Sequence, residues 1–210
     1  MVGALFFFYL QDYLGIGDKF AHVEIAALVF GVAGAGFWLR AMLYIGKHRA
    51  LAVGCATTLL TLVSMAFVRP GPNAFAIIFS LFAVSAFASA GFESAGWSMM
   101  ADVVDYGTLL TGERNAGNYY AAMSFITKIS IAAGGGFALI IAGTFGFSAE
   151  HANGPPAMRG FFLAFIAIPI VLHGIASVCA YRFPLDARRQ SIVRRRLESR
   201  RPATALRPAP

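Results

Sequence analysis

Long apolar segments separated by short polar breaks constrain this chain more than any other feature. A helix needs about 20 mostly apolar residues to cross the roughly 30 Å hydrocarbon core of a bilayer. The segments are continuous rather than alternating, which favours helices over the strands of a membrane barrel. We therefore predict an all-α membrane protein, a bundle of six transmembrane helices within residues 1–181. The predicted spans are residues 1–14, 23–45, 50–68, 73–100, 119–147 and 160–181.

The first predicted span is shorter than the others. Residues 1–14 read MVGALFFFYLQDYL, which falls short of the length that crosses a bilayer comfortably. The segment has neither a charged start nor a small-residue cleavage site, so it does not resemble a secretory signal peptide. We expect it to be the second half of a helix whose beginning is missing.

The composition excludes a water-soluble or disordered chain. Of the 210 residues, 58% are hydrophobic and 13% are charged, whereas a soluble domain is about 45–50% apolar and about 25% charged. The two cysteines, Cys55 and Cys179, lie in apolar runs and are too few for a disulfide framework or a zinc site. We expect them to serve as small apolar residues within the bundle.

Positive charge is concentrated at the C-terminal end. The chain has 17 Lys and Arg against 10 Asp and Glu, and nine arginines fall between Arg182 and Arg207. With six spans, 13 basic residues fall on one side of the membrane and three on the other. The positive-inside rule places the richer side in the cytoplasm. Residues 182–210, which supply most of this difference, are therefore predicted to be a basic cytoplasmic tail.

The tail itself allows several interpretations. Its arginines surround Ile192, Val193 and Leu197, a pattern typical of a basic amphipathic helix lying on anionic lipid. A solvated tail is the main alternative. Nucleic-acid binding is disfavoured, because no aromatic residues are interleaved with the arginines and the body of the chain is membranous.

Lys128 is the strongest candidate for a functional residue. It lies nine residues after Tyr119, about 13–14 Å into the bilayer, where a charged side chain is costly and normally faces a cavity or a partner. Its helical face otherwise carries the small residues Ala121, Ser124, Ala132 and Gly135. Such a face suits a neighbouring helix or a water-filled path. A structural ion pair is the alternative to a binding role.

Glu93 is a second charge inside a predicted span, about 10 Å from the end of that span. Ser85, Ser89 and Trp97 lie on the same helical face. A polar stripe with one aromatic ring suits a solute path, because aromatic rings stack on the faces of sugars. The alternatives are a Glu93 that its apolar surroundings keep neutral, or one that pairs with a neighbouring helix, with Lys128 as one candidate.

Two acids, Asp102 and Asp105, share a helical face where the fourth predicted span ends, and Arg114 follows a predicted turn. Two acids and an arginine at a membrane boundary suit a charge latch that breaks when helices move. A metal site is disfavoured, because no His or Cys lies near the acids. The four histidines are scattered, and no nucleophile and base are spaced for catalysis, so we do not expect an enzyme.

The stretch from Met100 to Lys128 carries a family resemblance. It reads MADVVDYGTLLTGERNAGNYYAAMSFITK: an acid pair with Tyr-Gly, then Thr-Gly-x-Arg, a glycine, an aromatic pair and the lysine. This pattern resembles the signature of the glycoside–pentoside–hexuronide cation symporters, the melibiose-permease-like branch of the major facilitator superfamily. The segment WLRAMLYIGKHR resembles that family's second-half copy of the cytoplasmic loop motif. The segment PLDARRQSIVRRRLESRR resembles the tail after its last helix.

The resemblance implies that the six spans are helices seven to twelve, the C-terminal half of a transporter whose two halves enclose a central site. It implies that Lys128 lines that site, although Glu93 falls where the family pattern has an uncharged, often aromatic, residue. The residues that we assign to substrate and cation binding are Lys128, Glu93, Ser124 and Trp97. Those that we assign to a cytoplasmic gate are Asp102, Asp105, Arg114 and Lys47.

The resemblance also implies a function. We expect secondary active transport of a sugar or glycoside, driven by a Na⁺ or H⁺ gradient across the plasma (inner) membrane, with no cofactor besides the coupling ion. The expected partners are a small sugar, the lipid bilayer and an N-terminal six-helix half that supplies the main acidic cation ligands. The alternative is a truncated or split gene product that is inactive alone and acts at most as an assembly partner for a separate N-terminal half.

Overall fold

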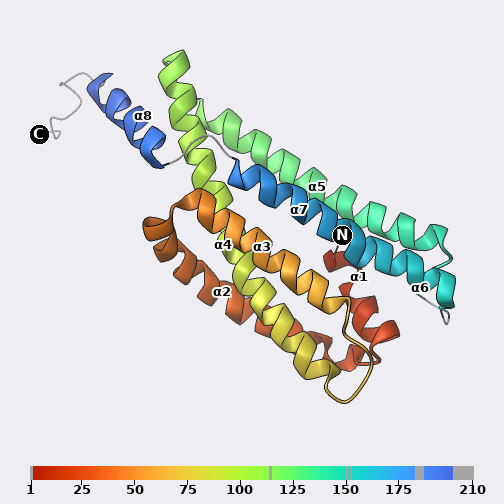
Figure 1. Ribbon diagram of the computed structural model, residues 1–210. Coiled ribbons are helices and arrows are strands. Elements are labelled where there is room, and N and C mark those ends of the chain that lie inside the picture. The colour runs from red at the N-terminus through yellow and green to blue at the C-terminus, as the bar shows by residue number, and fades with distance from the viewer. Residues whose placement is uncertain (1, 114, 150, 152, 183–186, 201–210) are drawn as a thin grey trace, which may run out of the picture.

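The computed structural model describes residues 2–113, 115–149, 151, 153–182 and 187–200, and every regular element in these ranges is helical (Figure 1). The all-α architecture predicted from the apolar segments is therefore confirmed. In chain order the elements are α1 (Val2–Phe8), η1 (Tyr9–Tyr13), η2 (Gly17–Lys19), α2 (Phe20–Ile45), α3 (Lys47–Met65), α4 (Ala74–Thr111), α5 (Ala116–Thr144), α6 (Pro155–Phe162), η3 (Leu163–Ala167), α7 (Ile168–Tyr181) and α8 (Ala187–Arg200).

Within the described ranges, five helical segments are long and apolar enough to cross a membrane. They are Gly17–Ile45, Lys47–Met65, Ala74–Thr111, Ala116–Thr144 and Pro155–Tyr181. The first predicted span is also helical, but α1 and the π-helical turn η1 together have 12 residues. That length covers about 18 Å, which is less than the bilayer core. The bundle thus has five full-length helical segments and one short one.

Two helix boundaries differ from the predicted spans. The connection between α2 and α3 is the single residue Gly46, at φ 85° and ψ 154°, so the polar residues that follow it begin α3 rather than forming a loop. α4 continues for 11 residues beyond Met100 and ends at Gly112, which has the left-handed φ of 78° that favours glycine. Hydropathy marks where a helix leaves the bilayer, whereas α2 and α4 each end at a glycine with a positive φ, Gly46 and Gly112.

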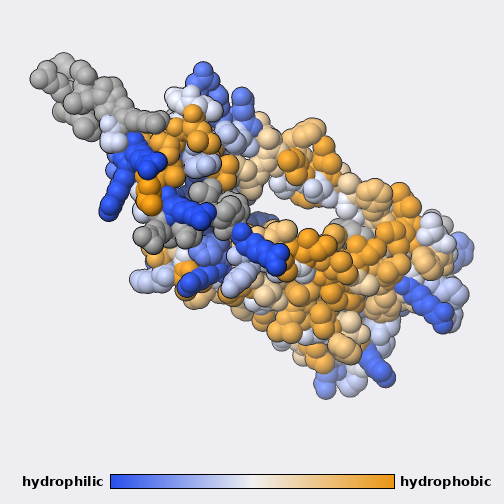
Figure 2. Space-filling model, turned by 45° about the horizontal axis from the view of Figure 1, so that its top comes forward, coloured by the Kyte–Doolittle hydropathy of each residue, from blue (hydrophilic) through white to orange (hydrophobic). Residues whose placement is uncertain are grey.

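α4 is the central helix of the first half of the bundle. It packs against both α2 and α3, and α3 also packs against α7 (Figure 1). α5 instead lies along α6 and η3, with α1 against it. Figure 2 shows apolar side chains over the middle of the visible face and strongly hydrophilic side chains toward its two ends, as expected for a chain that crosses a bilayer.

Small residues allow α2 and α4 to approach closely. A Cβ added at Gly34 of α2 would lie 2.6 Å from the Phe87 carbonyl oxygen, and one added at Gly91 of α4 would lie 2.5 Å from the Trp38 ring. The same ring donates a hydrogen bond from Nε1 to the Phe87 oxygen at 3.0 Å. Gly34 and Gly91 thus allow the two helices to come together, whereas Gly31 faces open space.

The short α1 is anchored by aromatic contacts. Phe6 stacks on Phe82 of α4 with ring centroids 4.1 Å apart, and Tyr9 stacks on Phe165 at 4.9 Å. The Tyr9 hydroxyl donates a hydrogen bond to the Met65 carbonyl oxygen at 2.8 Å. These contacts make α1 part of the apolar core of the bundle, although it is too short to span a membrane.

Candidate functional site

One face of α4 carries the polar stripe that the sequence predicts. Ser89, Glu93 and Trp97 follow one another at intervals of four residues, so they share a face. Ser89 is half-buried, Glu93 is exposed, and Trp97 is 41% exposed. They stay accessible because the small residues of α4, among them Ala88 and Gly91, occupy the faces that pack against α2 and α3.

A shallow groove runs beside this stripe. Its volume is about 440 Å³, and it lies between α2 and α4. Its polar residues are Ser89, Glu93 and Ser94, and most of the others are alanines and glycines from both helices. Glu93 therefore lies on a wall made mainly of small side chains, where a solute or another helix can come close to the backbone.

α5 carries a matching stripe. Tyr120, Ser124 and Lys128 follow one another at intervals of four residues. The Tyr120 ring stacks on Trp97 of α4, with centroids 6.2 Å apart and planes 15° from parallel. A neighbouring contact brings Tyr119 so close to Gly107 that an added Cβ there would lie 2.5 Å from the tyrosine hydroxyl. The two helices thus touch near the start of α5, at the Trp97–Tyr120 pair.

Lys128 lies two turns beyond that contact, about 12 Å further along α5. It is exposed, and no ion pair among the described residues joins it to Glu93. The small residues on its face leave Lys128 accessible. α5 as a whole is little buried within this chain. Figure 2 shows the molecule hollowed, with an opening passing through it. Lys128 is thus exposed, whereas the same helix face meets α1 two turns further on, where an added Cβ on Gly135 would lie 3.9 Å from Ala4.

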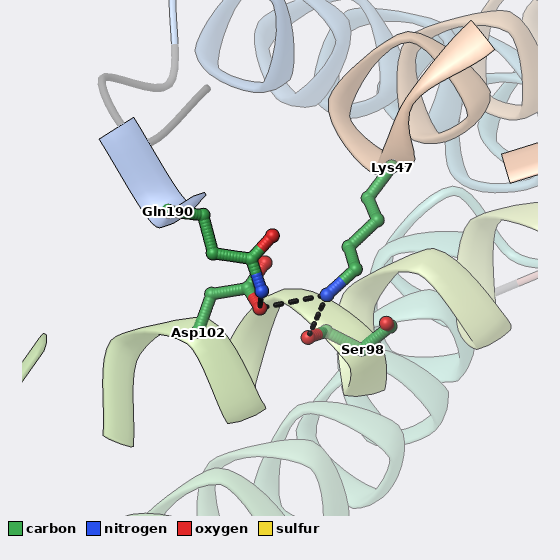
Figure 3. Close-up of polar contacts among 4 residues, drawn as sticks. All are labelled: Lys47, Ser98, Asp102 and Gln190. Carbon is green, nitrogen blue, oxygen red and sulfur yellow. Dashed lines mark hydrogen bonds and ion pairs between the residues drawn. The ribbon is translucent and has the colours of Figure 1, made fainter. Parts of the chain in front are cut away.

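The structure brings two of the four predicted gate residues together. Lys47, the first residue of α3, lies 2.7 Å from an Asp102 carboxylate oxygen through its Nζ and also donates a hydrogen bond to the Ser98 carbonyl oxygen at 3.2 Å (Figure 3). Asp102 is buried, with its side chain 6% exposed, whereas that of Lys47 is 28% exposed. The ion pair ties the start of α3 to α4 where α4 leaves the apolar band.

The other two predicted gate residues are not part of this contact. Asp105 lies nearly one turn further along α4 and is half-buried, and none of the salt bridges among the described residues includes it. Arg114 lies outside the described residues.

Lys47, Asp102 and Gln190 form a gate cluster, in which Gln190 was not predicted from the sequence. Its side-chain amide donates a hydrogen bond to the same Asp102 oxygen that Lys47 contacts (Figure 3). Gln190 comes from α8, so the cluster joins three elements that are far apart in the sequence. A signal was present, because Gln190 shares a helical face with Val193 and Leu197, the face by which an amphipathic helix packs.

The described residues offer no constellation for metal binding. No group of three or more His, Cys, Asp and Glu side chains in the described part of the chain is arranged to hold an ion. Of the two cysteines, Cys55 is buried and Cys179 is exposed. The site is therefore a polar path with an aromatic pair and a buried ion pair.

Comparisons with known proteins identify the family of this chain. Residues 1–187 match the family described as MFS/sugar transport protein. An uncharacterized symporter, YnaJ, of Bacillus subtilis (strain 168) is 27% identical over 160 residues, which are 75% of this chain and 34% of that protein. The isoprimeverose transporter of Lactiplantibacillus pentosus is 26% identical over 144 residues, 68% of this chain and 29% of that protein.

A third relative, the glucuronide carrier protein homolog of Escherichia coli (strain K12), is 33% identical over 89 residues, 42% of this chain and 20% of that protein. The matches therefore cover about a third or less of these three relatives. The resemblance to the cation symporters of sugars is confirmed, and this family consists of transporters rather than enzymes. The chain belongs to the MFS/sugar transport family, and it is a multi-pass α-helical membrane protein of the major facilitator superfamily.

Proposed function

We propose that this chain acts as the C-terminal half of a symporter that carries a sugar or glycoside with Na⁺ or H⁺. The family match over residues 1–187 supports transport. The single observation that carries the proposal for the site is the pair of polar stripes on α4 and α5, which meet at the stacked rings of Trp97 and Tyr120.

The chemistry of these stripes suits a sugar. An aromatic pair offers a flat apolar surface to the C–H face of a pyranose ring, as aromatic residues in binding sites commonly do. Ser124 and Lys128 of α5 supply donors for its hydroxyl oxygens, and Glu93 of α4 supplies an acceptor. The path would also hold the Glu93 carboxylate and the Lys128 ammonium. A coupling cation bound near them would change the electrostatic potential along the path.

The gate cluster suits alternating access. In a two-halved transporter the halves rock about a central site, so contacts at one end form in one state and break in the other. The pair of Lys47 with Asp102 lies at the end of the bundle that carries α8. We place this end in the cytoplasm of a cell whose plasma (inner) membrane holds the protein, because most arginines of the chain follow α7.

The path needs a second wall. α5 is largely exposed, and the two charged members of the stripes, Glu93 on α4 and Lys128 on α5, are exposed in this chain. A six-helix N-terminal half would cover these faces and supply the acidic ligands of the coupling ion. The second candidate function, a truncated or split product that only assembles with a separate half, is favoured by the same exposure of α5.

The two candidates differ in where the other half is encoded. We expect the DNA immediately upstream of the Met1 codon to encode a six-helix half in the same frame or one frameshift away. Finding no membrane segment there in any frame would favour the assembly-partner function and would count against the proposal of ordinary symport.

Uptake measurements test the role of Lys128. In the complete transporter, with the N-terminal half present, Lys128→Ala should lower gradient-driven uptake of a labelled glycoside by about ten- to a hundredfold, the loss expected for one charge-assisted hydrogen bond. The control is Lys19→Ala, since Lys19 pairs with Asp18 away from the path. Imposed Na⁺ and H⁺ gradients identify the coupling ion. Normal uptake by Lys128→Ala would contradict the assigned role.

A further inference from the structure

The length of α4 defines the depth at which α8 lies. Asp102 is 28 residues beyond Ala74, where α4 begins, or about 42 Å along the helix axis. A bilayer including its headgroups is about 40–45 Å thick. With the start of α4 at one surface of the membrane, Asp102 lies within the headgroup layer at the other side. Because Gln190, near the start of α8, binds Asp102 (Figure 3), the first turns of α8 lie near the same depth.

One side of α8 faces the bundle. Gln190 donates its hydrogen bond from this side, and Val193 and Leu197 follow at helical spacing. Val193 is only 6% exposed and Leu197 is half-buried. These contacts fix the rotation of α8 about its axis, so its remaining faces point away from α4.

The outward side combines one apolar side chain with cations. Ile192 is 45% exposed, and Arg195 and Arg196, three and four residues later, are exposed beside it. No ion pair among the described residues involves either arginine. Arg194 differs, because it pairs with Glu198 at 3.2 Å on another side of the helix.

We propose that Ile192, Arg195 and Arg196 form a binding surface for anionic phospholipids. At headgroup depth an exposed isoleucine can insert among the acyl chains, while guanidinium groups bind phosphates in a bidentate way. Nucleic acid, the other common partner of arginine clusters, does not explain the exposed isoleucine or the depth of α8. The surface is separate from the proposed sugar path, so it does not depend on which solute is carried.

Hydrogen exchange in nanodiscs tests the proposal on the full chain. The amides of α8 are compared in discs of phosphatidylcholine alone and in discs that also contain phosphatidylglycerol. We expect phosphatidylglycerol to slow exchange in α8 several-fold, and added salt to reduce the effect. Arg195→Gln should weaken this protection about fivefold, as expected for one basic residue at an anionic surface. Ile192→Ser should weaken it as well.

Arg194→Gln is the matched control. It removes the same charge from the same helix, and it should keep the protection by phosphatidylglycerol. Three results would overturn the proposal: equal exchange in the two lipids, an equal effect of Arg194→Gln and Arg195→Gln, or protection by an oligonucleotide that matches that of phosphatidylglycerol. Faster exchange of the variants in phosphatidylcholine alone would assign these residues to docking on α4 and would also overturn it.

Discussion

At the scale of single residues, Gly91 controls how closely α2 and α4 can approach. The Trp38 ring lies directly over it, and the same ring donates its hydrogen bond to the Phe87 carbonyl oxygen. The atoms that a new Cβ would meet are in the middle of the indole rather than at a flexible end. The ring would therefore have to move and would lose this hydrogen bond.

We predict that Gly91→Ala lowers the unfolding free energy by about 1–3 kcal/mol, the usual cost of adding a carbon to a close contact. Gly96→Ala in the same helix is the control, because its new Cβ would meet only Met123 Cε at an ordinary 4.0 Å. Thermal unfolding in detergent, followed by tryptophan fluorescence, compares the two variants. Equal stability of Gly91→Ala and Gly96→Ala would contradict this account of the α2–α4 contact.

At the scale of elements, Asp102 links the start of α3 and the tail helix α8 to α4. Its carboxylate is buried and accepts from both Lys47 and Gln190. Removal of Lys47 would take away the countercharge of the buried Asp102 carboxylate and leave it with the neutral Gln190 amide as its donor. Because Asp102 joins α3 and α8 to α4 through Lys47 and Gln190, these contacts are candidates to break when the two halves of a transporter move.

We predict that Lys47→Ala destabilises the bundle by about 1.5–3 kcal/mol, the range for a charged hydrogen bond whose partner remains buried. The double variant Lys47→Ala with Asp102→Asn should lose less than the sum of the two single variants. Arg49→Ala is the control, since Arg49 is exposed and lies outside this cluster. Additive losses in the double-mutant cycle would show that the two side chains do not interact.

The elements also show what the sequence can and cannot predict. The apolar segments predicted the long helices, since burial in lipid depends on composition over about 20 residues. They did not predict that α4 continues to Thr111, because a helix outside the bilayer needs no apolar residues. The contact of Lys47 with Asp102 was not derivable from spacing, since it joins residues 55 positions apart; only the resemblance grouped them. Gln190 was missed for the same reason.

At the scale of the whole molecule, the chain is a bundle with one face left uncovered. α2, α3 and α4 pack closely, whereas α5 is largely exposed and meets α4 at the Trp97–Tyr120 pair. The sequence predicted that the face of Lys128 belongs against a helix or a water-filled path. α1 reaches the far end of that face, where an added Cβ on Gly135 would lie 3.9 Å from Ala4, whereas Lys128 itself is exposed, so its role depends on the proposed second half.

Cysteine labelling tests whether this face of α5 lines the sugar path. In the complete transporter, with Cys55 and Cys179 replaced by serine, Ser124→Cys should react with a water-soluble maleimide, and the transported sugar should slow the reaction several-fold. Ile126→Cys is the control, because Ile126 is exposed on the opposite side of α5 and should face lipid and remain unreactive. Slow labelling of Ser124→Cys that sugar does not change, or equal labelling of both positions, would show that this face of α5 does not line the sugar path.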